Sequence, residues 1–268
     1  MLSDLLWRHR SIRKFKPDPV HPDLITKALE DAIAGTSSSG NLNSFSVILT
    51  RDEEKKRKLW SYHFEQDLIL QAPFIMTFCA DWHRTREWLR QRDAKDNFNN
   101  FLGYHVALVD AVILAQSVAL RLQEEGLGIC YLGTTLNGMK KIGELLELPD
   151  TCVPITTLAV GWPNESPAKR DRLPLEALIH DEIYQRPSPK DIDSIYQEKE
   201  IKGWERYMSY PDLKQAAEER GITSLAQFYT SEIKYSPEAF ARASEDLISV
   251  LRDKGFFPKD GCDTESQG

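Results

Sequence analysis

The stretch His9-Arg10-Ser11-Ile12-Arg13-Lys14-Phe15 places three cations, a hydroxyl and an imidazole within seven residues. The whole chain has a net charge of −7, so this stretch is a local positive cluster on an acidic protein. Guanidinium groups bind phosphate through two parallel hydrogen bonds, which lysine cannot copy. The stretch therefore indicates either an anion-binding segment or the solvent-exposed basic end of a helix.

Three other segments bear on that choice. A second basic cluster, Lys169-Arg170-Asp171-Arg172, lies far along the chain, and between the two clusters stand Thr36-Ser37-Ser38-Ser39-Gly40-Asn41 and Tyr131-Leu132-Gly133-Thr134-Thr135. Small hydroxyls let a flat ligand lie close to the backbone, and a glycine turn exposes backbone N–H groups. Taken singly, each segment is equally typical of an ordinary loop or strand exit. The two basic clusters gain meaning only if the fold brings both to one anion.

Composition excludes several classes of protein. The chain has 268 residues, of which 41% are hydrophobic and 28% charged, and this suits one large domain or two ordinary ones. Its acidic balance argues against nucleic acid as a partner, because binding phosphates requires a broad basic face. The four cysteines form no CxxC pair, which favours neither a disulfide framework nor a zinc site. We therefore expect a cytoplasmic protein.

Two apolar segments bear on membrane insertion and export. The N-terminus lacks the pattern of a signal peptide and is typical of a short amphipathic helix. The run from Val106 to Leu122 is interrupted by Asp110, Gln116 and Arg121. A charge at the centre of a bilayer is costly, so this run predicts a buried core helix and no membrane span.

Hydrophobic periodicity predicts alternating helices and strands. The expected helices cover residues 22–35, 53–60, 104–125 and 139–146, and the expected strands cover 45–50, 74–79, 127–132 and 155–160. The stretch 83–102 is polar and is predicted to be irregular. This order predicts helices layered against a small sheet. Beyond residue 187 the sequence predicts mostly polar helices carrying many aromatic residues, and a disordered tail over 261–268.

The motifs occur in an order that resembles the nitroreductase-like flavoprotein family. The sequence His-Arg-Ser-Ile-Arg-Lys-Phe is followed by the serine run, Gly126 to Gly133, Gly161-Trp162-Pro163 and Arg170-x-Arg172-Leu173-Pro174. The closest likeness is to the NADPH-dependent flavin reductase and oxygen-insensitive nitroreductase branch, over about residues 3–185. The resemblance implies an α+β three-layer fold with a small, mixed, mainly antiparallel sheet. It also implies an FMN-binding core over 1–187, a helical extension over 188–260, and a homodimer with FMN at the interface.

The resemblance also implies a set of FMN-binding residues. The phosphate would be bound by Ser11, Arg170 and Arg172, with His9 and Arg10 in the same matching segment. Arg13 would lie near N1 and O2, where a cation raises the flavin potential. The other implied contacts are Ser38, Ser39, Gln66, Tyr131, Leu132, Gly133 and Thr134. Many relatives have a second glycine at the position of Thr134.

These residues imply an FMN-dependent oxidoreductase with no catalytic side chain and no metal, because the flavin supplies the chemistry. It would take hydride from NAD(P)H and pass electrons to a small-molecule acceptor, such as a nitroaromatic, quinone or flavin, by a ping-pong mechanism. Lys202 and Arg206 are candidates for binding the NADPH 2′-phosphate, but equally for solvated helix charges. The alternatives are a flavin-binding carrier or regulatory module with little turnover, a flavoprotein of dehalogenation or flavin breakdown, and a flavin-free enzyme acting on a phosphate ligand.

Overall fold

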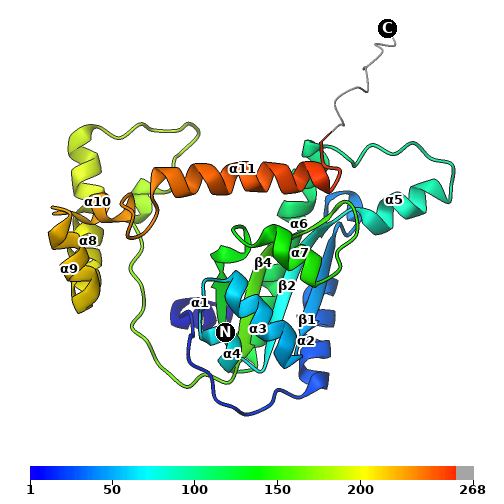
Figure 1. Ribbon diagram of the computed structural model, residues 1–268, viewed down its shortest axis with the longest axis horizontal. Helices are drawn as coiled ribbons and strands as arrows, with labels where there is room; N and C mark the ends of the chain where they lie inside the picture. Colours follow the sequence, from blue (N-terminus) through cyan, green and yellow to red (C-terminus); the bar gives the residue numbers. More distant parts are fainter. Residues whose placement is uncertain (258–268) are drawn as a thin grey trace, which may run out of the picture. The chain divides into compact units, whose positions relative to one another are not determined.

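A four-stranded antiparallel sheet organises the first of two units (Figure 1). The computed structural model describes residues 1–257, so the predicted tail over 261–268 and Cys262 lie outside the described residues. Unit 1 comprises residues 1–168 and 245–257, and unit 2 comprises Lys169–Ser244. The strands are β1 (Phe45–Thr50), β2 (Phe74–Asp81), β3 (Gly128–Leu132) and β4 (Cys152–Gly161), in the order β1-β2-β4-β3.

Both faces of the sheet are covered, and the alternation along β2 shows how. Phe74, Met76 and Phe78 point into one apolar cluster, which they share with α2 (Pro22–Gly35) and α6 (Phe101–Glu124). Ile75 points into a second cluster with α3 (Glu53–Tyr62), α4 (Leu68–Gln71) and α7 (Met139–Leu145). Successive strand side chains face opposite sides, so a strand buried on both faces reads as a continuous apolar run. The result is the three-layer arrangement expected from the sequence.

Helix α6 is the longest element of the first unit. With 24 residues and an 18-residue window of mean hydropathy 1.6, it is long and apolar enough to cross a membrane. Its residues Leu114, Val118 and Leu122 are nevertheless fully buried in the apolar core, as predicted for a core helix. Asn100 begins the helix by accepting a hydrogen bond from the Gly103 N–H at 2.9 Å.

The predicted elements are confirmed with small shifts at their ends, apart from one stretch. Residues 83–102 were predicted to be irregular, but α5 (His83–Arg90) lies there. The carboxylate of Asp81 accepts the His83 N–H at 2.8 Å, and Arg86 pairs with Asp96 at 2.6 Å. This helix depends on polar contacts with its neighbours rather than on an apolar period, which is why the sequence pattern missed it. The short amphipathic N-terminal helix is α1 (Leu2–Arg8).

Unit 2 is helical, as expected for the region beyond the core. It contains η3 (Leu175–Ala177), α8 (Pro189–Met208), α9 (Pro211–Glu219) and α10 (Leu225–Tyr229). Helix α11 (Pro237–Asp253) begins in unit 2 and ends in unit 1. Within unit 2, Tyr207 packs on Phe228 with ring centroids 4.7 Å apart, and the Lys234 ammonium donates to the Tyr207 hydroxyl at 2.7 Å. The aromatic residues noted in the sequence thus form part of the packing of this unit. The predicted division at residue 187 stays a prediction.

Candidate functional site

The basic segment His9–Phe15 lies in an extended conformation beside β3. Ser11 forms a parallel bridge with Ile129, and the Ile12 N–H donates to the Ile129 carbonyl at 2.9 Å. Gly128 permits this approach, because a Cβ there would lie 2.9 Å from the Cβ of Ile12. Ile12 is buried while Arg13 is exposed, so the alternation of an extended chain turns the guanidinium away from the core. Arg13 is thereby available to a ligand.

Arg13 has few partners of its own. Its guanidinium makes one long hydrogen bond, 3.4 Å from Nη1 to the Ser11 carbonyl. The backbone N–H groups of Arg13 and Lys14 both donate to Oε1 of Glu165, at 2.5 and 3.2 Å. Burial raises the pKa of the Cys130 thiol on β3, and the charge of Arg13 acts in the opposite direction. The guanidinium of Arg13 thus lies close enough to β3 for its positive charge to act on the Cys130 thiol.

The predicted serine pair is held by one buried carboxylate on α6. The Ser38 hydroxyl donates to Asp110 at 2.7 Å, and Ser39 donates to it through its backbone N–H at 3.1 Å and its hydroxyl at 3.2 Å. The Ser44 hydroxyl donates to the same carboxylate at 2.7 Å. Burial acts to raise the pKa of Asp110, but the hydrogen bonds from Ser44, Ser38 and Ser39 outweigh it and lower that pKa. The serine loop is therefore fixed by a charged anchor.

Two further residues of α6 hold other predicted site residues. The Tyr131 hydroxyl donates to Oε1 of the Gln116 side chain at 3.3 Å, and Gln123 Nε2 lies 3.0 Å from His9 Nδ1. Asp110, Gln116 and Gln123 thus connect one helix to the serine loop, to the end of β3 and to the basic segment. None of the three was predicted as a site residue. Asp110 and Gln116 were visible in the sequence as polar interruptions of an apolar run.

Gln66 and Thr134, predicted separately, lie together at the end of α3. Gln66 Nε2 donates to the Thr134 hydroxyl at 3.1 Å and to the His63 carbonyl at 3.0 Å. His63 Nδ1 lies 2.7 Å from the same Thr134 oxygen. The imidazole of His63 is fully buried, and burial lowers its pKa to about 4. His63 was not predicted, because nothing in the sequence around it indicates a site.

The turn after β3 is open, as an FMN site would require. A Cβ on Gly133 would meet no atom within 4 Å, whereas Leu132 beside it is buried. Buried side-chain nitrogens without a partner among the described residues include Arg10 Nε and His63 Nε2. The weakly engaged guanidinium of Arg13 and the unobstructed turn at Gly133 suit a ligand that combines a phosphate with a flat ring. The residues of unit 1 therefore fit FMN.

Arg170 and Arg172 belong to unit 2, where both are exposed. Arg172 Nη1 donates to the carbonyls of Asp171 and Arg170 at 3.0 and 3.3 Å, and Asp171 lies 3.9 Å from Arg206. Arg206, a candidate for nucleotide binding, is thus partly neutralised. The joint phosphate site of these arginines with Ser11 stays a prediction.

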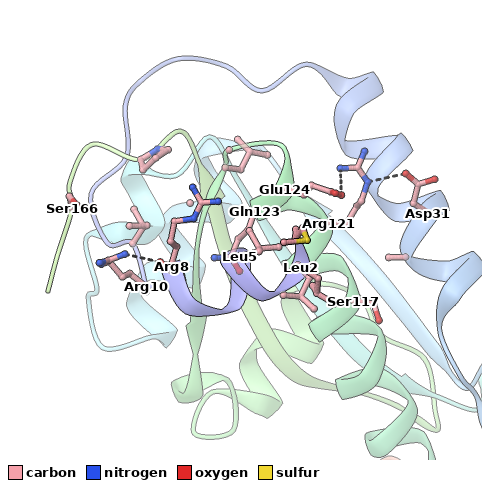
Figure 2. Close-up of a pocket in the computed structure, with 18 of the residues that line it drawn as sticks. Leu2, Leu5, Arg8, Arg10, Asp31, Ser117, Arg121, Gln123, Glu124 and Ser166 are labelled. Carbon is pink, nitrogen blue, oxygen red and sulfur yellow. Dashed lines mark hydrogen bonds and ion pairs between the residues drawn. The ribbon is translucent and has the colours of Figure 1, made fainter. Parts of the chain in front are cut away.

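A cavity of about 870 Å³ lies beside α1 and the C-terminal part of α6 (Figure 2). Of the predicted site residues, Arg10 lines it, and its Nη1 donates to the Arg8 carbonyl at 2.8 Å. Arg121 is paired across the cavity wall with Asp31 at 3.0 Å and with Glu124 at 3.2 Å. This cavity includes neither the serine loop nor the Gly133 turn, and Arg10 is the one predicted flavin contact among its lining residues.

The fold is that of an α+β flavoprotein oxidoreductase. Residues 6–162 match the sequence profile of the Nitroreductase family, and the chain belongs to that family. The FMN reductase (NADPH) of Bacillus subtilis is 32% identical over 183 residues, which cover 68% of this chain and 73% of that relative. An NADPH-dependent oxidoreductase of Staphylococcus aureus is 30% identical over 185 residues, with the same coverage.

Solved structures agree over nearly the whole chain. An oxidoreductase from Bacteroides fragilis has a TM-score of 0.85 and 36% identity, and covers 95% of this chain and 100% of its own. The NfrA1 nitroreductase from B. subtilis has a TM-score of 0.81 and 25% identity, and covers 96% of this chain and 99% of its own. The predicted family, the nitroreductase fold and the enzyme class, an FMN-dependent NAD(P)H oxidoreductase, are confirmed by these comparisons.

Proposed function

We propose that the protein takes hydride from NAD(P)H and passes the electrons to a small-molecule acceptor by a ping-pong mechanism. The acceptor classes expected from the sequence are nitroaromatics, quinones and flavins. The observation that carries the proposal is the connection of three predicted flavin segments to α6 through Asp110, Gln116 and Gln123. Separate loops fixed to one helix form a preorganised site. The names of the relatives, FMN reductase (NADPH) and NADPH-dependent oxidoreductase, favour NADPH as the reductant.

Each group of residues has a binding or orienting role. FMN, when bound, supplies the redox chemistry. Ser11, Arg170 and Arg172 would bind its phosphate, with His9 and Arg10 beside them. Arg13 presents a weakly engaged cation, which stabilises negative charge that develops on a neighbouring ring. The Gly133 turn leaves space against which a flat ring fits. The protein thus binds, orients and tunes the cofactor.

We also propose a homodimer with FMN at the subunit interface. Helix α6 exposes three apolar side chains in the single chain, Val109 (40% accessible), Val112 (45%) and Ile113 (39%). Neighbouring exposed apolar side chains of this kind favour burial against a partner. A cytoplasmic location, expected from the scattered cysteines, remains part of the proposal.

Flavin extraction from the purified protein, followed by anaerobic titration with NADH and then NADPH, tests the function. We expect a yellow protein that is bleached by one equivalent of reductant, and parallel double-reciprocal lines in steady-state assays. Intersecting lines would contradict the ping-pong mechanism. Slow bleaching by both nucleotides, with FMN bound, would indicate a carrier or regulatory module. A colourless protein that takes up no FMN would instead favour an enzyme acting on a phosphate ligand.

A further inference from the structure

The hydroxyl of Thr134 lies within hydrogen-bond distance of two side chains that follow α3. Gln66 Nε2 lies 3.1 Å from Thr134 Oγ1 and can only donate, because it is an amide nitrogen. His63 Nδ1 lies 2.7 Å from the same oxygen, and its role depends on the tautomer of the ring. The direction of the Thr134 proton therefore depends on which nitrogen of His63 is protonated.

The surroundings of His63 select one tautomer. The imidazole is fully buried, and its Nε2 has no partner among the described residues. If Nε2 carried the proton, a buried N–H donor would be left without an acceptor, which is rare in folded proteins. If Nδ1 carries the proton, it donates to Thr134 and leaves only an unpaired acceptor. The Nδ1–H tautomer is thus the less costly arrangement.

In that tautomer, both lone pairs of the Thr134 oxygen are occupied. A hydroxyl has two acceptor positions and one proton, so the proton is left for a third group. The described residues provide no acceptor for it among the hydrogen bonds of Thr134. Thr134 is half-buried and follows Gly133, beside which a Cβ would meet no atom within 4 Å. The hydroxyl proton of Thr134 thus has no acceptor among the described residues.

The backbone that brings His63 and Gln66 to Thr134 is strained. Phe64 and Glu65, between them, both have positive φ angles, of 54° and 57°. Two consecutive residues other than glycine in the left-handed region are costly, and such strain concentrates at functional sites. The close packing of the turn on α3 is a second constraint, because a Cβ on Gly138 would lie 2.9 Å from the Tyr62 carbonyl oxygen. This backbone therefore fixes both donors.

We propose that Thr134 is a hydrogen-bond donor to the bound flavin, and that His63 and Gln66 are positioning residues that direct its hydroxyl proton into the site. The inference rests on the proposed function, because it requires FMN at the turn after β3. A donor at this position stabilises negative charge that accumulates on the ring when electrons enter it. Thr134 thus tunes the flavin potential through a side-chain donor, which a glycine at this position would lack.

The primary test measures the dissociation constants of oxidised and reduced FMN. Thr134→Val removes the hydroxyl at nearly constant shape, and we expect it to lower the ratio of the oxidised to the reduced constant about tenfold. For a two-electron couple a tenfold change corresponds to a potential lower by about 30 mV. Thr134→Ser keeps the donor and should retain the wild-type ratio. An unchanged ratio in Thr134→Val, with FMN still bound, would overturn the proposal and leave the proposed function standing.

A pair of His63 variants tests the positioning role. The amide nitrogen of Asn superimposes on Nδ1 of histidine, whereas that of Gln superimposes on Nε2. We therefore expect His63→Asn to retain the wild-type ratio and His63→Gln to lower it toward that of Thr134→Val. In the Thr134→Val background, the two His63 variants should have equal ratios. Equal ratios for both variants in the wild-type background would contradict the role of His63.

A flavin-independent measurement covers the case in which the variants fold poorly. In protein labelled with ¹⁵N-histidine, long-range ¹H–¹⁵N correlation spectra distinguish the two neutral tautomers. We expect the Nδ1–H form for His63 in wild-type protein, with His63→Asn used for assignment. The Nε2–H form would overturn the proposal. Wild-type protein that binds no FMN would instead refute the proposed function, which is a distinguishable failure.

Discussion

Ser38 and Asp110 lie 2.7 Å apart, and this contact connects the serine loop to the longest helix of unit 1. Asp110 is 1% exposed and accepts hydrogen bonds from three serines. A carboxylate buried to this extent is stable only while its donors remain in place. The loop and the charge therefore stabilise each other.

We expect Asp110→Asn to lower the free energy of unfolding by about 3 kcal/mol, because an amide donor would then face hydroxyl donors. It should also weaken FMN binding, since the serine loop loses its anchor. Urea unfolding and FMN titration measure the two effects. Asp31→Asn is the matched control: Asp31 is partly exposed in its pair with Arg121, so this substitution should destabilise the protein much less than Asp110→Asn. Equal losses in both variants would contradict the role of Asp110.

Arg13→Ala tests the cation beside the predicted flavin ring. We expect FMN to bind about tenfold more weakly and the flavin potential to fall by about 30 mV or more, because positive charge favours the reduced state. Lys16→Ala removes a neighbouring exposed charge and should change neither quantity. A potential that stays at the wild-type value would show that Arg13 is not near the ring.

Gly128 and Gly133 predict opposite phenotypes for the same substitution. Gly128→Ala forces its Cβ against Ile12, so we expect a loss of about 1–3 kcal/mol in unfolding free energy. Gly133→Ala meets no protein atom within 4 Å, and we expect stability within about 1 kcal/mol of wild type together with weaker FMN binding. Thermal unfolding of the apoprotein and FMN titration separate the two. Normal FMN affinity in Gly133→Ala would place the ring elsewhere.

His63 predicts a loss of stability in acid. Its pKa is lowered from 6.5 to about 4 by burial, so between these values the unfolded chain binds a proton that the folded protein does not. The free energy of unfolding should therefore fall as the pH drops from 6.5 to 4, by about 3 kcal/mol in total from this group. Urea unfolding across this range checks the slope. His63→Asn cannot titrate there, so its curve should be flatter, and parallel curves would contradict the prediction.

The exposed face of α6 predicts the oligomeric state. We expect sedimentation velocity at micromolar concentration to give a dimer for wild type and a monomer for Val112→Asp, because a buried charge in an apolar interface is costly. Ile33→Asp on α2 introduces the same charge at a position of similar exposure, 46% against 45%, and should remain dimeric. A wild-type monomer with FMN still bound would contradict the proposed interface.

The local hydrophobic pattern predicted most of the fold, because buried strands and amphipathic helices each give it a characteristic period. The continuous apolar run of β2 and Gly35 at the end of the helix over 22–35 are signals of this kind. Helix α5 was missed because its contacts come from residues apart in sequence, such as Arg86 with Asp96. The carboxylate of Asp81, which accepts the His83 N–H, and an ion pair leave no periodic trace in the sequence.

For the candidate site, the sequence likewise indicated some residues and missed others. The residues expected to touch FMN were indicated by family motifs, and their roles stay predictions. The residues that hold them, Asp110, Gln123 and His63, were not predicted, since their significance depends on which side chains tertiary packing brings within hydrogen-bond distance. Thr134, in contrast, was noted in the sequence, because many relatives have a glycine at its position and Thr134 adds a side chain to this turn.

The three anchors on α6 also limit how the length of this chain can change during evolution. An α-helix turns by about 100° per residue, so inserting or deleting one residue between Asp110 and Gln123 would rotate one anchor away from its loop while the other stayed in place. Such a change would separate the serine loop from the basic segment, even if the helix itself remained intact. Length variation among descendants of this sequence should therefore accumulate outside this part of α6, in surface loops where no such register has to be kept.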